Sequence, residues 1–274
     1  MNSDAEARSE DLGNIIALEH VNLRVPDQQT ATLFYIMGLG LTRDPYMNVG
    51  VDNMWINVGE QQFHLPTSTA AQVLPGYVAL VLPDLAALEQ RLERVAPRLA
   101  GTAFAWKRER DHVAVTCPWG NSLRCYRPSA RFGPMQLGMP YVEFEVAPGA
   151  AAGIGRFYRQ VFGASSSLRR SRGSAAAVVE TGNRQALVFR ETAGARRPYD
   201  GHHVAVYVAD FSGPFSDLTK RGLIMEGLRN HQFRFKELVD PRGGAPVHTL
   251  EHEVRSLRHP GYHRNLVNRM GEEG

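Results

Sequence analysis

A pattern that occurs four times along the chain constrains its fold more than any other feature of the sequence. Four short segments alternate in polarity with a period of two, carry β-branched side chains and end in a proline or aspartate turn signal, as β-strands do. They begin near residues 18, 76, 139 and 201, so successive copies are about 60 residues apart. A helical pattern follows each segment, with room after it for about three short strands. The sequence therefore predicts four β-α-β-β-β modules.

The four helical patterns cover residues 28–38, 85–95, 152–163 and 211–222. Their apolar side chains recur at spacings of three and four residues, which places them on one face of a helix. A single module leaves one face of its sheet uncovered and has to pack against another module to bury it. We therefore expect an α+β fold of two tandem domains, each made of paired modules that form a curved mixed sheet around a cleft.

The order of the copies suggests where the domains lie. Residues 14–130 contain the first two modules and residues 137–258 contain the last two. The boundary is expected in residues 128–134, a stretch with proline, glycine and serine. Residues 1–13 are acidic and polar and are expected to form a disordered tail. Residues 259–274 form a C-terminal tail that packs back over a cleft or onto a partner subunit.

Charge and composition argue against several classes of protein. The formal net charge is only +3 and the basic residues are scattered, so no nucleic-acid partner is expected. No apolar run approaches the ~20 residues of a membrane span, and the N-terminus lacks the basic and then apolar order of a signal peptide. Cys117 and Cys125 are expected to be reduced thiols. We expect a cytoplasmic protein with a small-molecule substrate, as a monomer or a homodimer.

Three local motifs accompany the repeat. A strand carries His20, the next helix carries Phe34-Tyr35 followed by Gly-Leu-Gly-Leu at 38–41, and a hairpin turns at Pro-Trp-Gly-Asn, residues 118–121. With these motifs the chain resembles the vicinal oxygen chelate superfamily over nearly its whole length. That superfamily includes glyoxalases, extradiol dioxygenases, epimerases, thiol transferases that inactivate antibiotics, and metal-free drug-binding proteins. The resemblance implies the fold more specifically than the reaction.

Strand alternation predicts which side chains line the clefts. In the first strand the apolar residues cover the helix, so His20, Asn22 and Arg24 face the cleft. The positions equivalent to His20 in the other three copies are Tyr77, Tyr141 and His203. The corresponding cleft positions on the last strands of the four copies are His64, Arg124, Arg190 and Glu251.

The resemblance implies a metal site at some of these positions. Metal-dependent relatives typically use two histidines and a glutamate, a set that suits Fe, Mn, Zn or Ni. In ring-cleaving relatives the set lies in the second domain, which gives Tyr141, His203 and Glu251 here. Tyr141 departs from the expected histidine. We expect His203 and Glu251 to bind a divalent metal, with Tyr141 and Arg190 orienting an anionic substrate.

The first domain offers His20, His64, Tyr77 and Arg124 as substrate-binding residues. Its two imidazoles could hold a metal, but an arginine at the carboxylate position repels a cation and favours a carboxylate or a phosphate. Each cleft therefore has only part of a metal-ligand set, with His20 and His64 in the first and His203 and Glu251 in the second. The two domains could therefore divide the work, with one active cleft and one degenerate cleft.

Two functions remain open at this point. The first is a divalent-metal-dependent dioxygenase, lyase or isomerase that acts on a small oxygen-rich anionic or aromatic substrate. The second is a metal-free, drug-sequestering protein whose cleft holds its ligand between aromatic residues such as Tyr141, Tyr207 and Trp55. His231 is either a proton-transfer residue or a histidine of a surface loop. The sequence contains no nucleotide-binding glycine loop, serine-nucleophile elbow or Cys-X-X-Cys pair.

Overall fold

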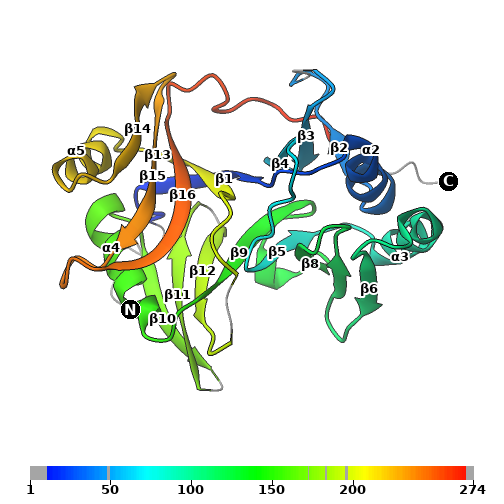
Figure 1. The fold of residues 1–274 in the computed structure, drawn as a ribbon, viewed down its shortest axis with the longest axis horizontal. Coiled ribbons are helices and arrows are strands. Elements are labelled where there is room, and N and C mark those ends of the chain that lie inside the picture. The colour runs from blue at the N-terminus through cyan, green and yellow to red at the C-terminus, as the bar shows by residue number, and fades with distance from the viewer. Residues whose placement is uncertain (1–10, 48–49, 172, 183, 195–196, 270–274) are drawn as a thin grey trace.

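In the computed structural model, two eight-stranded mixed sheets carry the fold (Figure 1). The structure describes residues 11–47, 50–171, 173–182, 184–194 and 197–269. Residues 1–10, which make up most of the expected disordered tail, lie outside these ranges. No helix within the described part of the chain is long and apolar enough to cross a membrane.

All four modules run strand, helix and then three strands. The first contains β1 (Ile15–Asn22), α2 (Gln28–Ala31) continued by the π-helix η1 (Thr32–Gly38), β2 (Thr42–Arg43), β3 (Asn53–Val58) and β4 (Gln61–Pro66). The second contains β5 (Gly76–Val81), α3 (Leu85–Val95), the 3-10 turn η2 (Ala96–Leu99), β6 (Ala105–Arg108), β7 (Val113–Thr116) and β8 (Ser122–Tyr126). The third follows the 3-10 turn η3 (Ala130–Phe132) and contains β9 (Gly138–Val146), α4 (Ala150–Phe162), β10 (Ser166–Ser171), β11 (Ser174–Glu180) and β12 (Ala186–Glu191). The fourth contains β13 (His203–Val208), α5 (Ser212–Lys220), β14 (Ile224–Arg229), β15 (Gln232–Val239) and β16 (Pro246–Ser256).

Aspartates that follow the first two repeated strands explain why a helix starts after each of them. The carboxylate of Asp27 accepts a hydrogen bond from the backbone N–H of Thr30 at 2.7 Å. The carboxylate of Asp84 accepts from the N–H groups of Ala86 and Ala87 at 2.8 and 3.0 Å. Each aspartate satisfies N–H groups that have no partner inside the helix, a capping contact worth about 1 kcal/mol. All four helices begin and end within two residues of their predicted positions.

The modules pair differently from the expected order. One sheet, which we call the terminal sheet, has the order β14-β15-β16-β13-β1-β4-β3-β2 and joins the first and fourth modules. The other, which we call the central sheet, has the order β10-β11-β12-β9-β5-β8-β7-β6 and joins the second and third modules. The expectation that residues 14–130 and residues 137–258 each form a sheet of their own is therefore wrong. The expected curved mixed sheets of paired modules are present, with other partners.

The antiparallel pairing of first strands decides these partners. β1 pairs with β13, and β5 pairs with β9. The four first strands carry the same alternating pattern, so periodicity identifies each of them as a strand that needs a neighbour. It does not select which of the other three that neighbour is. The sequence therefore predicted the modules correctly and their pairing incorrectly.

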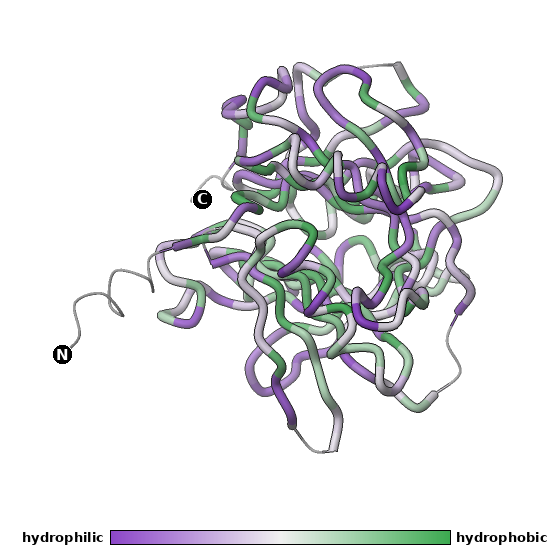
Figure 2. The backbone as a smooth tube through the Cα atoms, turned by 90° about the vertical axis from the view of Figure 1, so that its left-hand side faces the viewer, coloured by the Kyte–Doolittle hydropathy of each residue, from purple (hydrophilic) through white to green (hydrophobic). Residues whose placement is uncertain are grey.

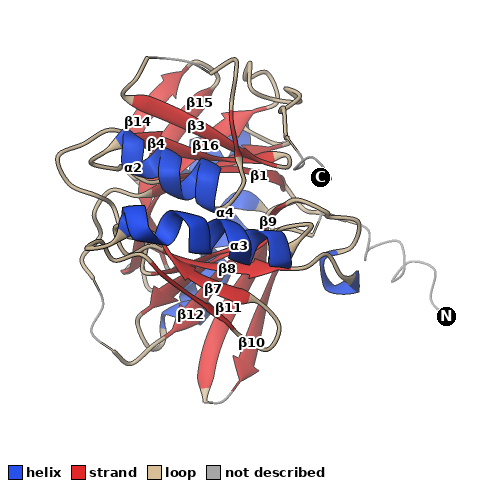
Figure 3. Cartoon of the chain, turned by 90° about the vertical axis from the view of Figure 1, so that its right-hand side faces the viewer, coloured by secondary structure: helices blue, strands red, loops and turns tan. Residues whose placement is uncertain are grey.

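Helices from both sheets meet in a shared core. Figure 3 shows α2 and α3 side by side, and η1 contacts α3 directly. Helix α4 packs against β10 and β11 of the central sheet and also against β15 and β16 of the terminal sheet. Hydrophobic stretches concentrate where the strands cross the interior (Figure 2). One continuous cluster of buried apolar side chains therefore joins the two sheets.

The C-terminal segment 259–269 crosses from the end of β16 to β2 and β3 (Figure 1). Arg264 bonds to the carboxylate of Asp44 at 2.9 Å, and the side-chain amide of Asn57 donates to the carbonyl of Val267 at 2.9 Å. The described part of the tail thus packs back onto the first module of its own chain. It ties together the two modules that form the terminal sheet.

The contact between Tyr158 and His252 should contribute measurably to stability. Nδ1 of the fully buried His252 donates to the carbonyl of Leu250 at 2.7 Å, so its Nε2 accepts from the Tyr158 hydroxyl at 2.6 Å. A Tyr158→Phe variant leaves this nitrogen without a partner, and the free energy of unfolding should fall by about 1–3 kcal/mol. Urea unfolding measures the change. Tyr46→Phe, at a side chain that is 72% exposed, is the control, and equal effects of the two substitutions would contradict the assignment.

The same histidine predicts a pH dependence of stability. Burial lowers the pKa of His252 to about 3 from its ordinary value of 6.5. Between these values the unfolded chain binds a proton that the folded chain does not, so stability is full above the ordinary pKa and falls with decreasing pH. The free energy of unfolding, measured at about pH 6.5 and about pH 5, should fall less in His252→Gln than in the wild type. The difference should be up to ~1.4 kcal/mol per pH unit. An equally steep fall in both proteins would show that His252 is not buried in its neutral form.

Candidate metal centre

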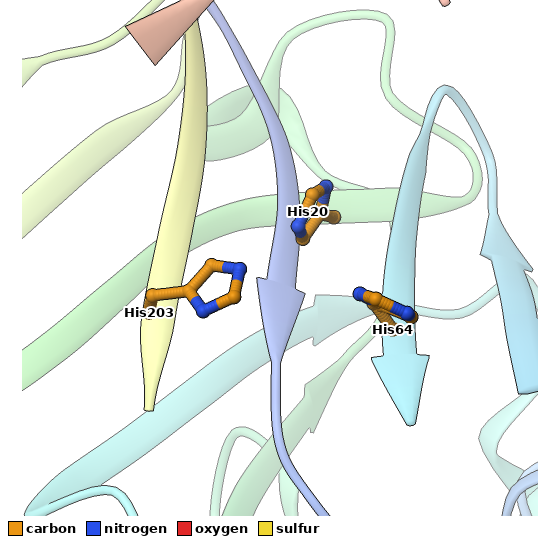
Figure 4. Close-up of side chains that lie close together, drawn as sticks. All are labelled: His20, His64 and His203. Atoms are coloured by element: carbon orange, nitrogen blue, oxygen red, sulfur yellow. The ribbon is translucent and has the colours of Figure 1, made fainter. Parts of the chain in front are cut away.

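Three histidines lie together on the terminal sheet. His20 belongs to β1, His64 to β4 and His203 to β13, which are consecutive strands in the sheet order. Register brings them together, because Asn22 of β1 lies opposite His64 on one side and His203 on the other. One ligand atom from each imidazole lies within 4.8 Å of the other two, and the three side chains gather across the neighbouring strands (Figure 4).

Neighbouring side chains hold two of the rings. Nδ1 of His20 donates to the carboxylate of Glu19. Nε2 of His64 donates to the amide oxygen of Asn53 at 2.7 Å. The indole of Trp55 stacks on His64 with 3.9 Å between ring centroids. These contacts leave Nε2 of His20 and Nδ1 of His64 with their lone pairs free, as in metal sites whose ligands are oriented by a second hydrogen bond.

Two buried nitrogens of this cluster lack a hydrogen-bond partner among the described residues. They are Nε2 of His20 and Nε2 of His203. His20 is fully buried and His203 is 7% exposed. A buried polar atom without a partner costs free energy, and a bound ion is one of the ordinary ways in which such an atom is satisfied. A cation between the rings would satisfy both nitrogens.

The protonation states suit metal binding. Burial, with the nearby charges of His20 and Arg255, lowers the pKa of His64 to about 2. Burial and the charges of His20 and Arg234 also lower the pKa of His203 well below its ordinary value. Both rings are therefore neutral at neutral pH, which is the form that binds a metal.

Two carboxylates on β16 flank His203. Glu251 lies 3.7 Å from its Nδ1 and Glu253 lies 3.9 Å from its Nε2. Arg234 of β15 bonds to both carboxylates, to Glu251 at 2.7 Å. Arg255 also bonds to Glu253, at 2.5 and 2.6 Å. The carboxylates are therefore held by arginines at the edge of the three-histidine group.

Sequence reasoning missed several of these neighbours. Strict alternation would send Glu19 to the opposite face from His20. The pairing of β1 with β13 shifts register between Leu18 and His20, and this irregularity accompanies the contact between Glu19 and His20. The amide of Asn53 and the guanidinium of Arg234 carried no motif that could have indicated their partners. Glu253 follows Glu251 by two residues on β16, and alternation places it on the same face.

The structure regroups the predicted cleft residues. His20 and His64 were expected in one cleft and His203 with Glu251 in another. They lie together because the first and fourth modules share a sheet, so the expected separation is wrong. Glu251 lies beside the cluster but outside the group formed by the three imidazoles.

Tyr141 and Arg190 lie in the central sheet, and their expected place beside His203 is also wrong. Tyr141 is on β9, where its hydroxyl lies 3.4 Å from that of Tyr77. Arg190 is on β12 and bonds to Glu143 at 2.8 Å. The pairing of the second and third modules again explains this placement.

The remaining predicted residues take different positions. His231 lies in the turn between β14 and β15, where it is exposed. Tyr207 is on β13, and its hydroxyl lies 3.4 Å from Nδ1 of His259 and 3.5 Å from Arg255. Tyr207 therefore contacts the C-terminal segment, and His231 takes the surface-loop alternative.

Comparison with known proteins shows a likeness of structure without a likeness of sequence. The chain matches no protein-family model, and it matches no curated protein. It is similar to glyoxalase I from Zea mays with a TM-score of 0.63 and 13% identity over 87% of this chain and 92% of that chain. A mutant form of the same maize protein gives a TM-score of 0.62 and 14% identity over 93% of this chain and 96% of that one.

A third similar structure is a putative dioxygenase from Bacillus subtilis, with a TM-score of 0.59 and 14% identity over 90% of this chain and 86% of that chain. These matches extend over both sheets and all four modules. Identity at this level establishes a shared architecture. The chain therefore has the paired β-α-β-β-β fold seen in glyoxalase I.

Proposed function

We propose that this protein is a divalent-metal-dependent enzyme that binds its metal through His20, His64 and His203. One observation carries the proposal: three imidazoles from three strands, two buried and one half-buried, converge within 4.8 Å. Three nitrogen ligands leave coordination positions open for substrate, as catalytic metal sites require. They suit Fe, Mn, Zn or Ni. The glyoxalase and dioxygenase names of similar structures support a small oxygen-rich anionic or aromatic substrate.

The protein's own groups have distinct tasks in this proposal. Glu19 orients the ring of His20, and Asn53 fixes the proton of His64 on Nε2. A divalent metal, when bound, polarises the substrate oxygens as a Lewis acid. Glu251 and Glu253 supply negative charge beside the cluster and are the groups placed to accept a substrate proton. Dioxygenase, lyase or isomerase chemistry is compatible with this set.

Arg234 restrains the carboxylates of Glu251 and Glu253. Its guanidinium bonds to Glu251 and Glu253 together, which holds both carboxylates beside His203. Although burial opposes ionisation, the charges of His20, Arg255 and Arg234 lower the pKa of Glu253. Its carboxylate is therefore ionised at neutral pH, and the arginines compete with a metal for it.

A metal-free binding protein of the same fold is the second candidate. The observation that favours it is the pairing of both carboxylates with Arg234 and Arg255, which leaves only the imidazoles for a cation. In that case Trp55, stacked on His64, forms an aromatic wall for a ligand. Metal analysis separates the two candidates.

Metal content is the direct test of the proposal. The full chain, purified without a histidine tag and loaded with Fe, Mn, Ni or Zn, should retain about one ion per chain with at least one of these metals. His20→Ala and His203→Ala should each abolish this binding. His112→Ala is the matched control, because His112 precedes β7 of the central sheet. Less than about a tenth of an equivalent with all four metals would favour the metal-free candidate.

The groups that orient the ligands should tune metal affinity. Asn53→Ala removes the acceptor of the His64 Nε2 proton, and Glu19→Gln removes the charge beside His20. Each should weaken metal binding about 10–100-fold, measured by competition with a chelator. Glu60→Gln, at an exposed residue between β3 and β4, should leave the affinity unchanged. If all three variants bind alike, Glu19 and Asn53 have no role in holding the ligands.

A further inference from the structure

The central sheet has a cleft in the position that corresponds to the metal centre. The two sheets have the same strand order, in which β5, β8, β9 and β12 take the places of β1, β4, β13 and β16. The parallel and antiparallel pairings also correspond. Side chains of the two sheets can therefore be matched position by position from the strand register.

Register replaces the three imidazoles with groups that do not bind a cation. Asn22 lies opposite His64 and His203, and its counterpart Ala79 lies opposite Arg124 and Tyr141. The counterpart of His20 is Tyr77. The positions of the two glutamates in β16 are held in β12 by Ala186 and Val188. An arginine with two neutral tyrosines repels a metal ion and attracts an anion.

The strand register also shows which residue of the terminal sheet corresponds to Arg190. Arg190 lies opposite Glu145, and Arg255 lies opposite Tyr207, at equivalent places in their sheets. Arg190 therefore corresponds to Arg255 and not to Glu251, as the sequence had suggested. Both arginines bond to a carboxylate of their own sheet, Arg190 to Glu143 at 2.8 Å.

A cavity of about 570 Å³ opens on this face. Its volume lies in the range of small-molecule sites. Tyr77, Trp106 and Arg124 line it, together with the hydroxyl-bearing Thr116 and Ser122. The cavity therefore combines aromatic surface, hydroxyl groups and a guanidinium.

Among the charged residues of this cavity, Arg124 is the one cation without a carboxylate partner in the described part of the chain. Lys107 pairs with Glu109 at 2.9 Å, and Arg190 pairs with Glu143. The guanidinium carbon of Arg124 lies 3.7 Å from the centroid of the Tyr77 ring. That contact leaves its N–H donors free in the plane of the group, which is the geometry that binds a carboxylate or phosphate through two hydrogen bonds. Glu145 also lines the cavity and is exposed.

We propose that this cavity is a second, metal-free site for a small aromatic anion. Arg124 binds the carboxylate or phosphate of the ligand, and Trp106 contacts its ring. The site is independent of the metal centre, because its side chains belong to the other sheet. The chain then carries one cleft for a cation and one for an anion, built from the same strand plan.

Isothermal titration of the full-length protein with benzoate and phenyl phosphate tests the proposal, with benzamide as the uncharged analogue. At least one anion should bind at least about tenfold more tightly than benzamide, because only an anion forms the two charged hydrogen bonds with Arg124. Arg124→Gln should weaken that binding at least about tenfold, and Arg124→Lys should weaken it less. Arg98→Gln, at an exposed arginine of η2, is the matched control.

Two further variants separate this site from the metal centre and from misfolding. His203→Ala should leave anion binding unchanged, whereas Ser122→Trp, which fills the cavity and keeps Arg124, should abolish it. Thermal unfolding confirms that each variant is folded. Binding that is absent in the wild type, equal for benzamide, unaffected by Arg124→Gln or lost in His203→Ala would overturn the proposal.

Discussion

The antiparallel pairing of β1 with β13 is the interaction on which the candidate site depends. It joins modules at opposite ends of the sequence and places His203 beside His20 and His64. Asn22 of β1 lies opposite His203 on one neighbouring strand and opposite His64 on the other. If β1 paired with β5 instead, the three imidazoles would lie in two sheets. The C-terminal segment reinforces the pairing by running from β16 to the first module, where Arg264 bonds to Asp44. Strand partnership thus determines the chemistry.

Buried carboxylates near this strand pair are ionised, although burial by itself favours their neutral form. Although burial raises it, the interactions with His20 and Arg255 lower the pKa of Glu19 to about 2. Arg255 bonds to Glu19 and Glu253, and Arg234 bonds to Glu253 from the other side. Buried ions are tolerated only when each is paired, and breaking one partner away is costly. The network therefore holds the imidazole of His20 in place through Glu19 and keeps the carboxylates of Glu19 and Glu253 ionised.

Much of the fold follows from sequence periodicity, whereas the grouping of the site does not. Alternation, helical spacing and the capping aspartates Asp27 and Asp84 define four modules, since each signal is local. The partner of each first strand depends on long-range packing that four similar strands cannot encode in their pattern. His20, His64 and His203 were each predicted to face a cleft, but their convergence required the observed pairing. The contact of Glu19 with His20 depends on a register shift that alternation cannot predict.

The proposed metal centre requires that His20, His64 and His203, from the two ends of the chain, hold one ion together. A crystal structure of the metal-loaded full-length protein, with diffraction data collected at the absorption edge of the metal, tests it most directly. We expect an anomalous peak within bonding distance of Nε2 of His20, Nδ1 of His64 and Nε2 of His203. A peak at other residues, or three imidazoles without a peak in crystals grown with excess metal, would contradict it.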